Sequence, residues 1–299
     1  MMGKNRPRFA AMEASPSTTH ARHRLRGYLP RFSRRDIVEG ALIAVAFLLY
    51  FWVRGAVVDK PESAYWHARD VIDAQRALGI FWEPSWNDWA AAHHAIAQAL
   101  NLVYFYLHFP LIIAFGMWVY YYRRSRYTFV RDSFLASGAI ALVIYWLYPV
   151  APPRDLPGLA TQYDPGAPAY IHGFIDTMKE YLGYAYDSQS THAFVNPYAA
   201  MPSLHFGWDL LLGIAIIGCF RGTRLAWIAV PVGVFLPVSQ IFAITMTANH
   251  FLLDAAAGGV VAMAGLGVSA ALQRWGYPWL SDRARRLPRR GKAAEPAST

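Results

Sequence analysis

The chain has 299 residues, of which 55% are hydrophobic and 16% are charged. A soluble domain ordinarily has about 45–50% apolar and about 25% charged residues, so this composition indicates a membrane protein. The formal net charge of +9 does not indicate nucleic-acid binding, because the basic residues lie between hydrophobic segments and not on one predicted face. Cys219 is the only cysteine of the sequence, so an intramolecular disulfide and a cysteine metal cluster are both excluded. It lies in an apolar segment.

The two ends of the chain are basic and weakly hydrophobic. We expect residues 1–36 to be a disordered cytoplasmic arm rather than a transit peptide. The apolar segment that follows this arm is too long for a signal peptide and has no obvious cleavage site. Residues 276–299 are predicted to be a basic cytoplasmic tail, and residues 37–275 a single membrane domain.

Six segments of this domain are apolar over the roughly 17–25 residues that a helix needs to cross about 30 Å of hydrocarbon. Helices are expected because a spanning segment must satisfy its own backbone hydrogen bonds, and the alternating pattern of a membrane β-barrel is absent. The predicted spans are 37–57, 100–122, 133–150, 204–220, 224–245 and 251–273. The predicted fold class is therefore all-α, a polytopic bundle of six transmembrane helices.

Basic residues predict the orientation of these spans. Most of the 28 lysines and arginines lie before the first span, between the second and third, between the fourth and fifth, or after the sixth. These four regions share one side of the membrane in an alternating topology, and the positive-inside rule places that side in the cytoplasm. We therefore predict a multi-pass protein of the cell membrane with both termini in the cytoplasm.

Two long connections are predicted on the extracytoplasmic side. Residues 58–99 contain four tryptophans among acidic groups, and we expect helices lying in the membrane interface. The apolar residues at helical spacing there include Val71, Ile72, Ala74 and Leu78. These helices are either a structural cap on the bundle or a lid or groove for a lipid chain. Residues 151–203, rich in Gly, Pro, Tyr and Asp, are predicted to form an ordered outer active-site loop.

Three short clusters lie at the predicted outer membrane boundary. The first is Pro152-Pro153-Arg154 after the third span, the second runs from Met201 to His205 at the start of the fourth, and the third runs from Asn249 to Asp254 at the start of the sixth. Ionisable residues beside membrane spans are rare and tend to be functional. The three clusters are therefore predicted to form one site.

His250 and Asp254 are four residues apart on a predicted helix. This spacing puts both side chains on one face, with Cβ atoms about 5–6 Å apart, so the carboxylate can accept a hydrogen bond from one ring nitrogen. The other ring nitrogen then stays basic, and the imidazole can act as a nucleophile toward phosphorus or as a general base. Asn249, directly before His250, is a candidate supporting residue.

The start of the fourth span is a predicted anion site. Pro202 suits the first turn of a helix, and Ser203 supplies a hydroxyl beside free backbone N–H groups, which favour a phosphate. Arg154 offers a planar guanidinium for two phosphate oxygens or, alternatively, an anchor to lipid headgroups. Asp209 follows His205 by four residues and either orients that histidine or is paired inside the bundle.

The motifs in this order resemble the type 2 phosphatidic acid phosphatase superfamily. Within it, they are most similar to the inositol phosphorylceramide synthase, or inositolphosphotransferase, branch. The resemblance covers about residues 40–270. It is carried by Pro-x-x-Pro-Pro-Arg at 149–154, Met-Pro-Ser-Leu-His at 201–205 and His-x-x-x-Asp at 250–254.

The chain departs from the phosphatase pattern at three positions. Leu147 stands where a lysine of the first motif would be, and Ile244 stands where an arginine of the third motif would be. Asp155, rather than proline, follows Arg154. Fewer cations then remain to balance the charge of a transition state, which favours the transferase branch over a simple phosphatase.

The resemblance implies a role for each matching residue. His250 would be the nucleophile that forms a phosphohistidine, Asp254 its orienting carboxylate, and His205 the acid that protonates the leaving oxygen. Arg154 and Ser203 would hold the phosphoryl oxygens. The implied enzyme needs no metal and no cofactor. Its substrate would be a membrane lipid phosphate, and its acceptor either water, as in a lipid phosphate or polyprenyl diphosphate phosphatase, or an alcohol or sugar.

Two other classes of membrane protein stay open at this stage. A zinc-dependent hydrolase would use His205, His250 and either His93 or His94 as ligands, although zinc favours three or four closely arranged ligands. A transporter would place its ionisable groups near the bilayer midplane, often in discontinuous helices. In this chain the ionisable groups gather at the predicted outer boundary, which favours catalysis over transport.

Overall fold

The computed structural model describes residues 33–104, 108–182 and 196–286. Within these ranges the chain forms helices and loops without a named β-strand, so the all-α prediction is confirmed there. The chain divides into two units, Met1–Val45 and Ala46–Thr299. The described part of the first unit belongs mostly to α2 (Arg34–Val57), and all later helices belong to the second unit.

Four described helical segments are long and apolar enough to cross a membrane. They are α2, α7 (Arg124–Leu147), α13 (Ala226–Met246) and the segment Leu252–Arg283, which begins with α14 (Leu252–Ala271). α12 (Leu204–Phe220) is apolar but has 17 residues, and α6 (His108–Tyr122) has 15. Length and hydropathy therefore identify four candidate spans where six are predicted.

The structure differs from the predicted boundaries at two spans. The predicted span 100–122 is described as two helices, α5 (His94–Leu102) and α6, and residues 105–107 between them lie outside the described residues. The third span begins earlier than predicted, at Arg124. Arginine is a good helix former, and its long side chain can carry the charge away from an apolar surface, so a basic segment can form the first turns of a spanning helix.

Small residues allow the helices of the second unit to approach closely. A Cβ atom on Gly213 of α12 would overlap the backbone of Gly233 in α13. A Cβ atom on Gly258 of α14 would overlap the carbonyl oxygen of Ser203, directly before α12. Close approach of this kind is how membrane helices gain packing contacts, because apolar side chains gain little from leaving lipid.

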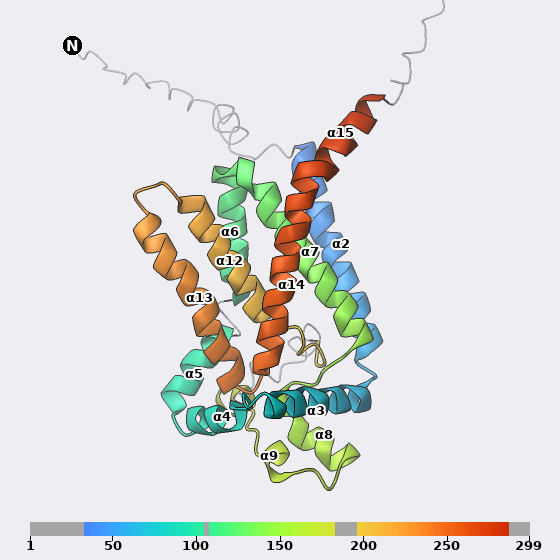
Figure 1. The fold of residues 1–299 in the computed structure, drawn as a ribbon, viewed down its shortest axis with the longest axis vertical. Helices are drawn as coiled ribbons and strands as arrows, with labels where there is room; N and C mark the ends of the chain where they lie inside the picture. The colour runs from blue at the N-terminus through green and yellow to red at the C-terminus, as the bar shows by residue number, and fades with distance from the viewer. Residues whose placement is uncertain (1–32, 105–107, 183–195, 287–299) are drawn as a thin grey trace, which may run out of the picture. The chain divides into compact units, whose positions relative to one another are not determined.

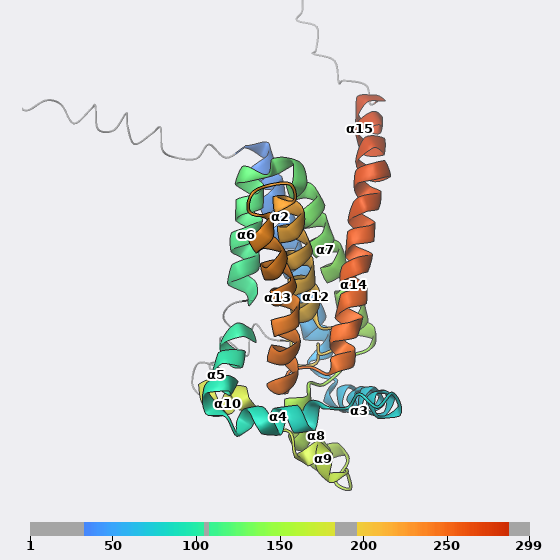
Figure 2. The same ribbon diagram turned by 60° about the vertical axis from the view of Figure 1, so that its left-hand side comes forward.

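The two ends of this bundle differ. Figures 1 and 2 show α3 (Pro61–Ala77), α4 (Glu83–Ala91) and α8 (Leu156–Tyr163) at the end where α12 and α14 begin. The α6–α7 and α12–α13 connections lie at the opposite end. The sequence predicted helices within 58–99, and α3, α4 and most of α5 are found there. Val71 and Ile72 are buried as the spacing suggests, but Ala74 and Leu78 are exposed.

The predicted outer loop, 151–203, contains short helices rather than irregular chain alone. They are the 3₁₀ turn η2 (Pro153–Asp155), α8, α9 (Ala169–His172) and α10 (Thr177–Leu182). Residues 183–195 of this loop lie outside the described residues.

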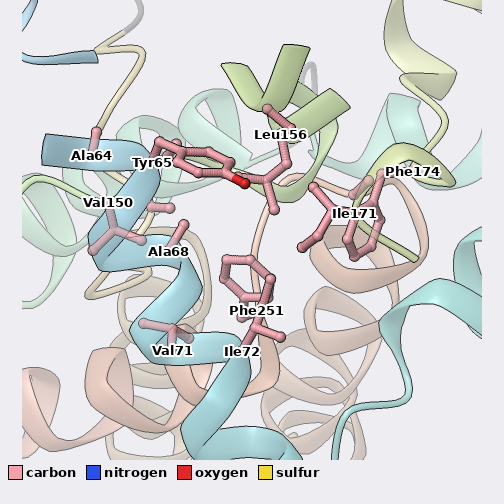
Figure 3. Close-up of a cluster of buried hydrophobic side chains, with 14 residues drawn as sticks. Ala64, Tyr65, Ala68, Val71, Ile72, Val150, Leu156, Ile171, Phe174 and Phe251 are labelled. Atoms are coloured by element: carbon pink, nitrogen blue, oxygen red, sulfur yellow. The ribbon is translucent and has the colours of Figure 1, made fainter. Parts of the chain in front are cut away.

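A cluster of buried apolar side chains joins α3 to the outer loop and to the start of α14 (Figure 3). Phe251 and Ile72 are fully buried in it. Its members are Ala64, Tyr65, Ala68, Val71, Ile72, Val150, Ala151, Leu156, Ala160, Ile171, Phe174, Ala200, Ala248 and Phe251. Burial of apolar surface contributes roughly 25 cal/mol per Å², so this cluster fixes α3 against the residues that adjoin the predicted site.

The predicted arm over 1–36 lies outside the described residues except for residues 33–36, where α2 begins. The predicted tail over 276–299 is described as far as residue 286. There the π-helical turn η4 (Leu272–Gly276) leads from α14 into α15 (Tyr277–Arg286).

Candidate active site

Backbone hydrogen bonds join the three predicted motif segments. They run from the Ala200 N–H to the Val150 carbonyl (3.1 Å), from the Arg154 N–H to the Ala248 carbonyl (2.9 Å) and from the Ser203 N–H to the Asp254 carbonyl (2.8 Å). Segments that are far apart in the sequence are thus held together by main-chain contacts. The fold brings the three clusters to one place, as the sequence predicts.

The two motif histidines lie beside each other. The ring centroids of His205 and His250 are 5.6 Å apart, and the rings are tilted by 53°. Nδ1 of His250 lies 2.8 Å from the carbonyl oxygen of Ala200, and the ring is buried. Because a carbonyl oxygen only accepts hydrogen bonds, Nδ1 carries the hydrogen, and in the neutral imidazole Nε2 then carries the lone pair. This is the tautomer that a nucleophilic Nε2 requires.

The carboxylate of Asp254 is fully buried beside this histidine. Its Oδ2 lies 3.5 Å from Nδ1 of His250 and accepts the Phe251 N–H at 2.8 Å. The predicted placement of both residues on one helix is wrong, because α14 begins at Leu252, after His250. The Ala200 carbonyl is therefore the nearer partner of the ring, while Asp254 caps the helix by accepting the Phe251 N–H.

Ser203 and His205 occupy the start of α12. Ser203 is the N-cap, and its hydroxyl oxygen accepts the Phe206 N–H at 3.4 Å. His205 lies in the first turn, where backbone N–H groups favour an anion. The ring of Tyr104 stacks on His205 with centroids 4.2 Å apart.

Arg154 lies in η2 with its side chain almost wholly buried. Its Nε is 3.6 Å from the carboxylate of Asp155, the residue that replaces the expected proline. The Arg154 N–H donates to the carbonyl of Ala248, two residues before His250, and the ring of His250 lies beside that of His205. Arg154, His205 and His250 therefore share one site.

A second histidine–aspartate pair, which the sequence motifs do not reveal, adjoins this site. Asp209 Oδ1 lies 2.8 Å from Nδ1 of His108, and both residues are buried. The ring of His108 lies 4.7 Å from that of His205. Of the two alternatives for Asp209, pairing inside the bundle is the one that the structure shows. His108 could have been found as an ionisable residue within a predicted span, where such residues tend to be functional.

Asn249 supports the turn before His250. Its Nδ2 donates to the Thr247 hydroxyl at 2.6 Å and lies 3.3 Å from the sulfur of Met178. Ala248, between Thr247 and Asn249, has a φ of +57°, which is uncommon for a residue with a side chain and marks a tight turn.

Two further side chains contact the start of α14, and no sequence signal indicated them. Glu83 of α4 accepts the Leu252 N–H at 2.7 Å, and Gln75 of α3 accepts the Leu253 N–H at 2.8 Å. Burial raises the pKa of the Glu83 carboxyl, and the nearby Asp254 acts in the same direction.

The structure does not assemble the zinc ligands considered above. Among the described residues there is no group of three His, Cys, Asp or Glu side chains suited to a metal. His93 bonds the Trp89 carbonyl at 2.7 Å, and His94 contacts the ring of Tyr181.

Together, the apolar helices and the adjacent histidines His205 and His250, near the buried Arg154, define a helical membrane protein with a cluster of ionisable side chains at one end of its bundle. The model of the PAP2 superfamily matches residues 69–268, and the chain belongs to this superfamily. Searches of curated proteins and of solved structures gave no significant match. Members of the superfamily are phosphatases or phosphotransferases, so this membrane protein is an enzyme of the lipid phosphate type.

Proposed function

We propose that the protein is a lipid phosphotransferase, similar to an inositolphosphotransferase, that works through a phosphohistidine on His250. The observation that carries this proposal is the hydrogen bond between Nδ1 of His250 and the Ala200 carbonyl, in a ring whose centroid lies 5.6 Å from that of His205. It leaves Nε2 as the basic nitrogen beside a second histidine. No metal or cofactor is part of the proposal.

In the first step, Nε2 of His250 attacks phosphorus and the bond from phosphorus to the leaving oxygen breaks. Protonated His205 gives its proton to that oxygen. Arg154 and Ser203 bind the non-bridging oxygens, and Asp254 offsets the positive charge that develops on His250. Phosphoryl transfer depends mainly on such positioning and charge stabilisation.

In the second step, the acceptor hydroxyl gives its proton to the now neutral His205, its oxygen attacks phosphorus, and the bond to Nε2 of His250 breaks. Water and an alcohol enter in the same way, so the acceptor decides between hydrolysis and transfer. The apolar Leu147 and Ile244, at positions where a phosphatase would carry cations, favour an alcohol.

We further propose a six-span topology with the site on the extracytoplasmic face of the cell membrane. The basic connections α6–α7 and α12–α13 lie at the end of the bundle opposite the starts of α12 and α14 (Figure 1). The positive-inside rule then assigns the site to the other face.

The proposal is tested with purified protein and a lipid phosphate labelled with ³²P. We expect an acid-labile, base-stable phosphoenzyme, and a labelled product that changes from inorganic phosphate to a phosphate ester when an alcohol such as inositol is added. His250→Ala should form neither the phosphoenzyme nor the labelled product, and its kcat should be lower by about 10⁴-fold or more. His172→Ala, at an exposed position on α9, is the matched control and should keep both. An unchanged rate in the His250 variant would falsify the proposal.

A further inference from the structure

Side chains from α3 and α4 cap the start of α14. The first N–H groups of a helix have no partner within the helix. Here the Leu252 N–H donates to Oε1 of Glu83 (2.7 Å), and the Leu253 N–H donates to Oε1 of Gln75 (2.8 Å). Nε2 of Gln75 also donates to Oε1 of Glu83 (2.9 Å), which ties the two capping groups together. Both caps come from positions more than 160 residues earlier in the chain.

These caps act on the residues directly after His250. With the Phe251 N–H held by Asp254 at 2.8 Å, three successive N–H groups are bound by three different carboxylate or amide oxygens. Phe251 itself is fully buried in the apolar cluster that Ile72 of α3 joins. Polar and apolar contacts therefore hold the same short segment against α3.

Burial of the capping carboxylate has an energetic cost. Glu83 and Gln75 are both fully buried, and Oε2 of Glu83 has no hydrogen-bond partner among the described residues. Burial of a carboxyl group with one unsatisfied oxygen opposes folding, and it raises the pKa of Glu83. A carboxylate that only stabilised the fold would be expected at the exposed end of a helix, where its interaction with the helix dipole is less costly.

We propose that Gln75 and Glu83 are positioning residues for the nucleophile, which they act on through the start of α14. The α3–α4 segment would then be a part of the catalytic framework rather than only a cap or a lid. This inference rests on the proposed function, in which His250 must meet phosphorus at close range. A displacement of about 1 Å at a reacting group can cost about 100-fold in rate.

The kinetic test compares variants that remove the cap with variants that keep it. Glu83→Leu and Gln75→Leu remove an acceptor, and we expect kcat to fall about 10- to 100-fold with KM within about twofold. Glu83→Gln keeps the acceptor oxygen and should hold kcat within about threefold of wild type. Asp88→Leu on α4 and Asp73→Leu on α3 are exposed acidic controls and should match wild type. A Glu83→Gln variant as slow as Glu83→Leu overturns the capping role.

A structural measurement makes the outcome independent of activity. Hydrogen–deuterium exchange of the full-length protein in detergent should be faster at the Leu252 amide in Glu83→Leu and at the Leu253 amide in Gln75→Leu, and unchanged in Glu83→Gln. If Glu83→Leu does not fold, the test rests on the milder Gln75→Leu variant. This variant keeps the hydrogen bond from the Leu252 N–H to Glu83. If both leucine variants exchange these amides at the wild-type rate, the inference is overturned. It is also overturned if either leucine variant has the kcat of the wild type. A wild type without phosphoryl transfer, but with the predicted exchange pattern, contradicts the proposed function and not the cap.

Discussion

His250 and His108 are both held at Nδ1, but by partners of different chemistry. A backbone carbonyl accepts from a neutral imidazole and leaves its charge unchanged, which suits a nucleophile. A carboxylate such as that of Asp209 also stabilises an imidazolium. The ring centroid of His205 lies 4.7 Å from that of His108 and 5.6 Å from that of His250, so the proposed acid–base histidine adjoins two histidines whose rings are both fixed at Nδ1.

The proposed role of His205 predicts a dependence on the leaving group. His205→Asn should slow turnover of a lipid alkyl phosphate by about 10²- to 10⁴-fold, because the departing alkoxide needs a proton. A p-nitrophenyl phosphate ester has a leaving group that departs without one, so the variant should still form the phosphoenzyme and then react slowly with the acceptor. Rapid mixing should show a burst of about one p-nitrophenol per active site. Formation of the phosphoenzyme from the p-nitrophenyl ester that is slowed as much as its formation from the alkyl phosphate, with no burst, would exclude His205 as the acid.

At the scale of helices, the site depends on how closely α12 and α14 approach each other. A Cβ atom on Gly207 of α12 would lie 2.6 Å from the Gly258 carbonyl oxygen, and one on Gly258 would overlap the Ser203 carbonyl oxygen. The bond from the Ser203 N–H to the Asp254 carbonyl forms at this crossing. The close packing of α12 on α14 therefore also joins the second motif to the third.

Gly258→Ala tests this contact. The added methyl group has no space, so we expect the variant to lose about 1–3 kcal/mol of unfolding free energy and to lose activity as α12 moves away from α14. Gly267→Ala on the same helix is the matched control, since no atom lies within 4 Å of its Cβ position. Alanine is the better helix former, so this control should be no less stable than wild type. Thermal unfolding in detergent distinguishes the two, and equal transition temperatures would contradict the predicted crossing.

At the scale of the whole molecule, features that depend on local sequence were predictable. The prediction of 204–220 agrees with α12, because Ser203 is its N-cap and charged residues follow its end. Pro202 lies before the N-cap and not in the first turn, where it was expected. The expected topology placed the three motifs at one boundary of the membrane, and main-chain hydrogen bonds join them in the structure. The long-range partners were not: a backbone carbonyl such as that of Ala200 has no sequence signature, and Glu83 looks like any acidic residue on an interfacial helix. Such contacts follow only from how α3 and α4 pack on the bundle.

The remaining whole-molecule prediction concerns which end of the bundle faces outward. In a Cys219→Ser background, Asp73→Cys places an exposed thiol on α3, and Arg221→Cys places one in the basic α12–α13 connection. The two positions belong to opposite ends of the bundle, as the elements show in Figures 1 and 2. The positive-inside rule predicts that a membrane-impermeant maleimide labels the first variant in intact cells and the second only after permeabilisation. The reverse pattern would place the histidines in the cytoplasm, and the lipid phosphate would then have to be supplied from the inner leaflet.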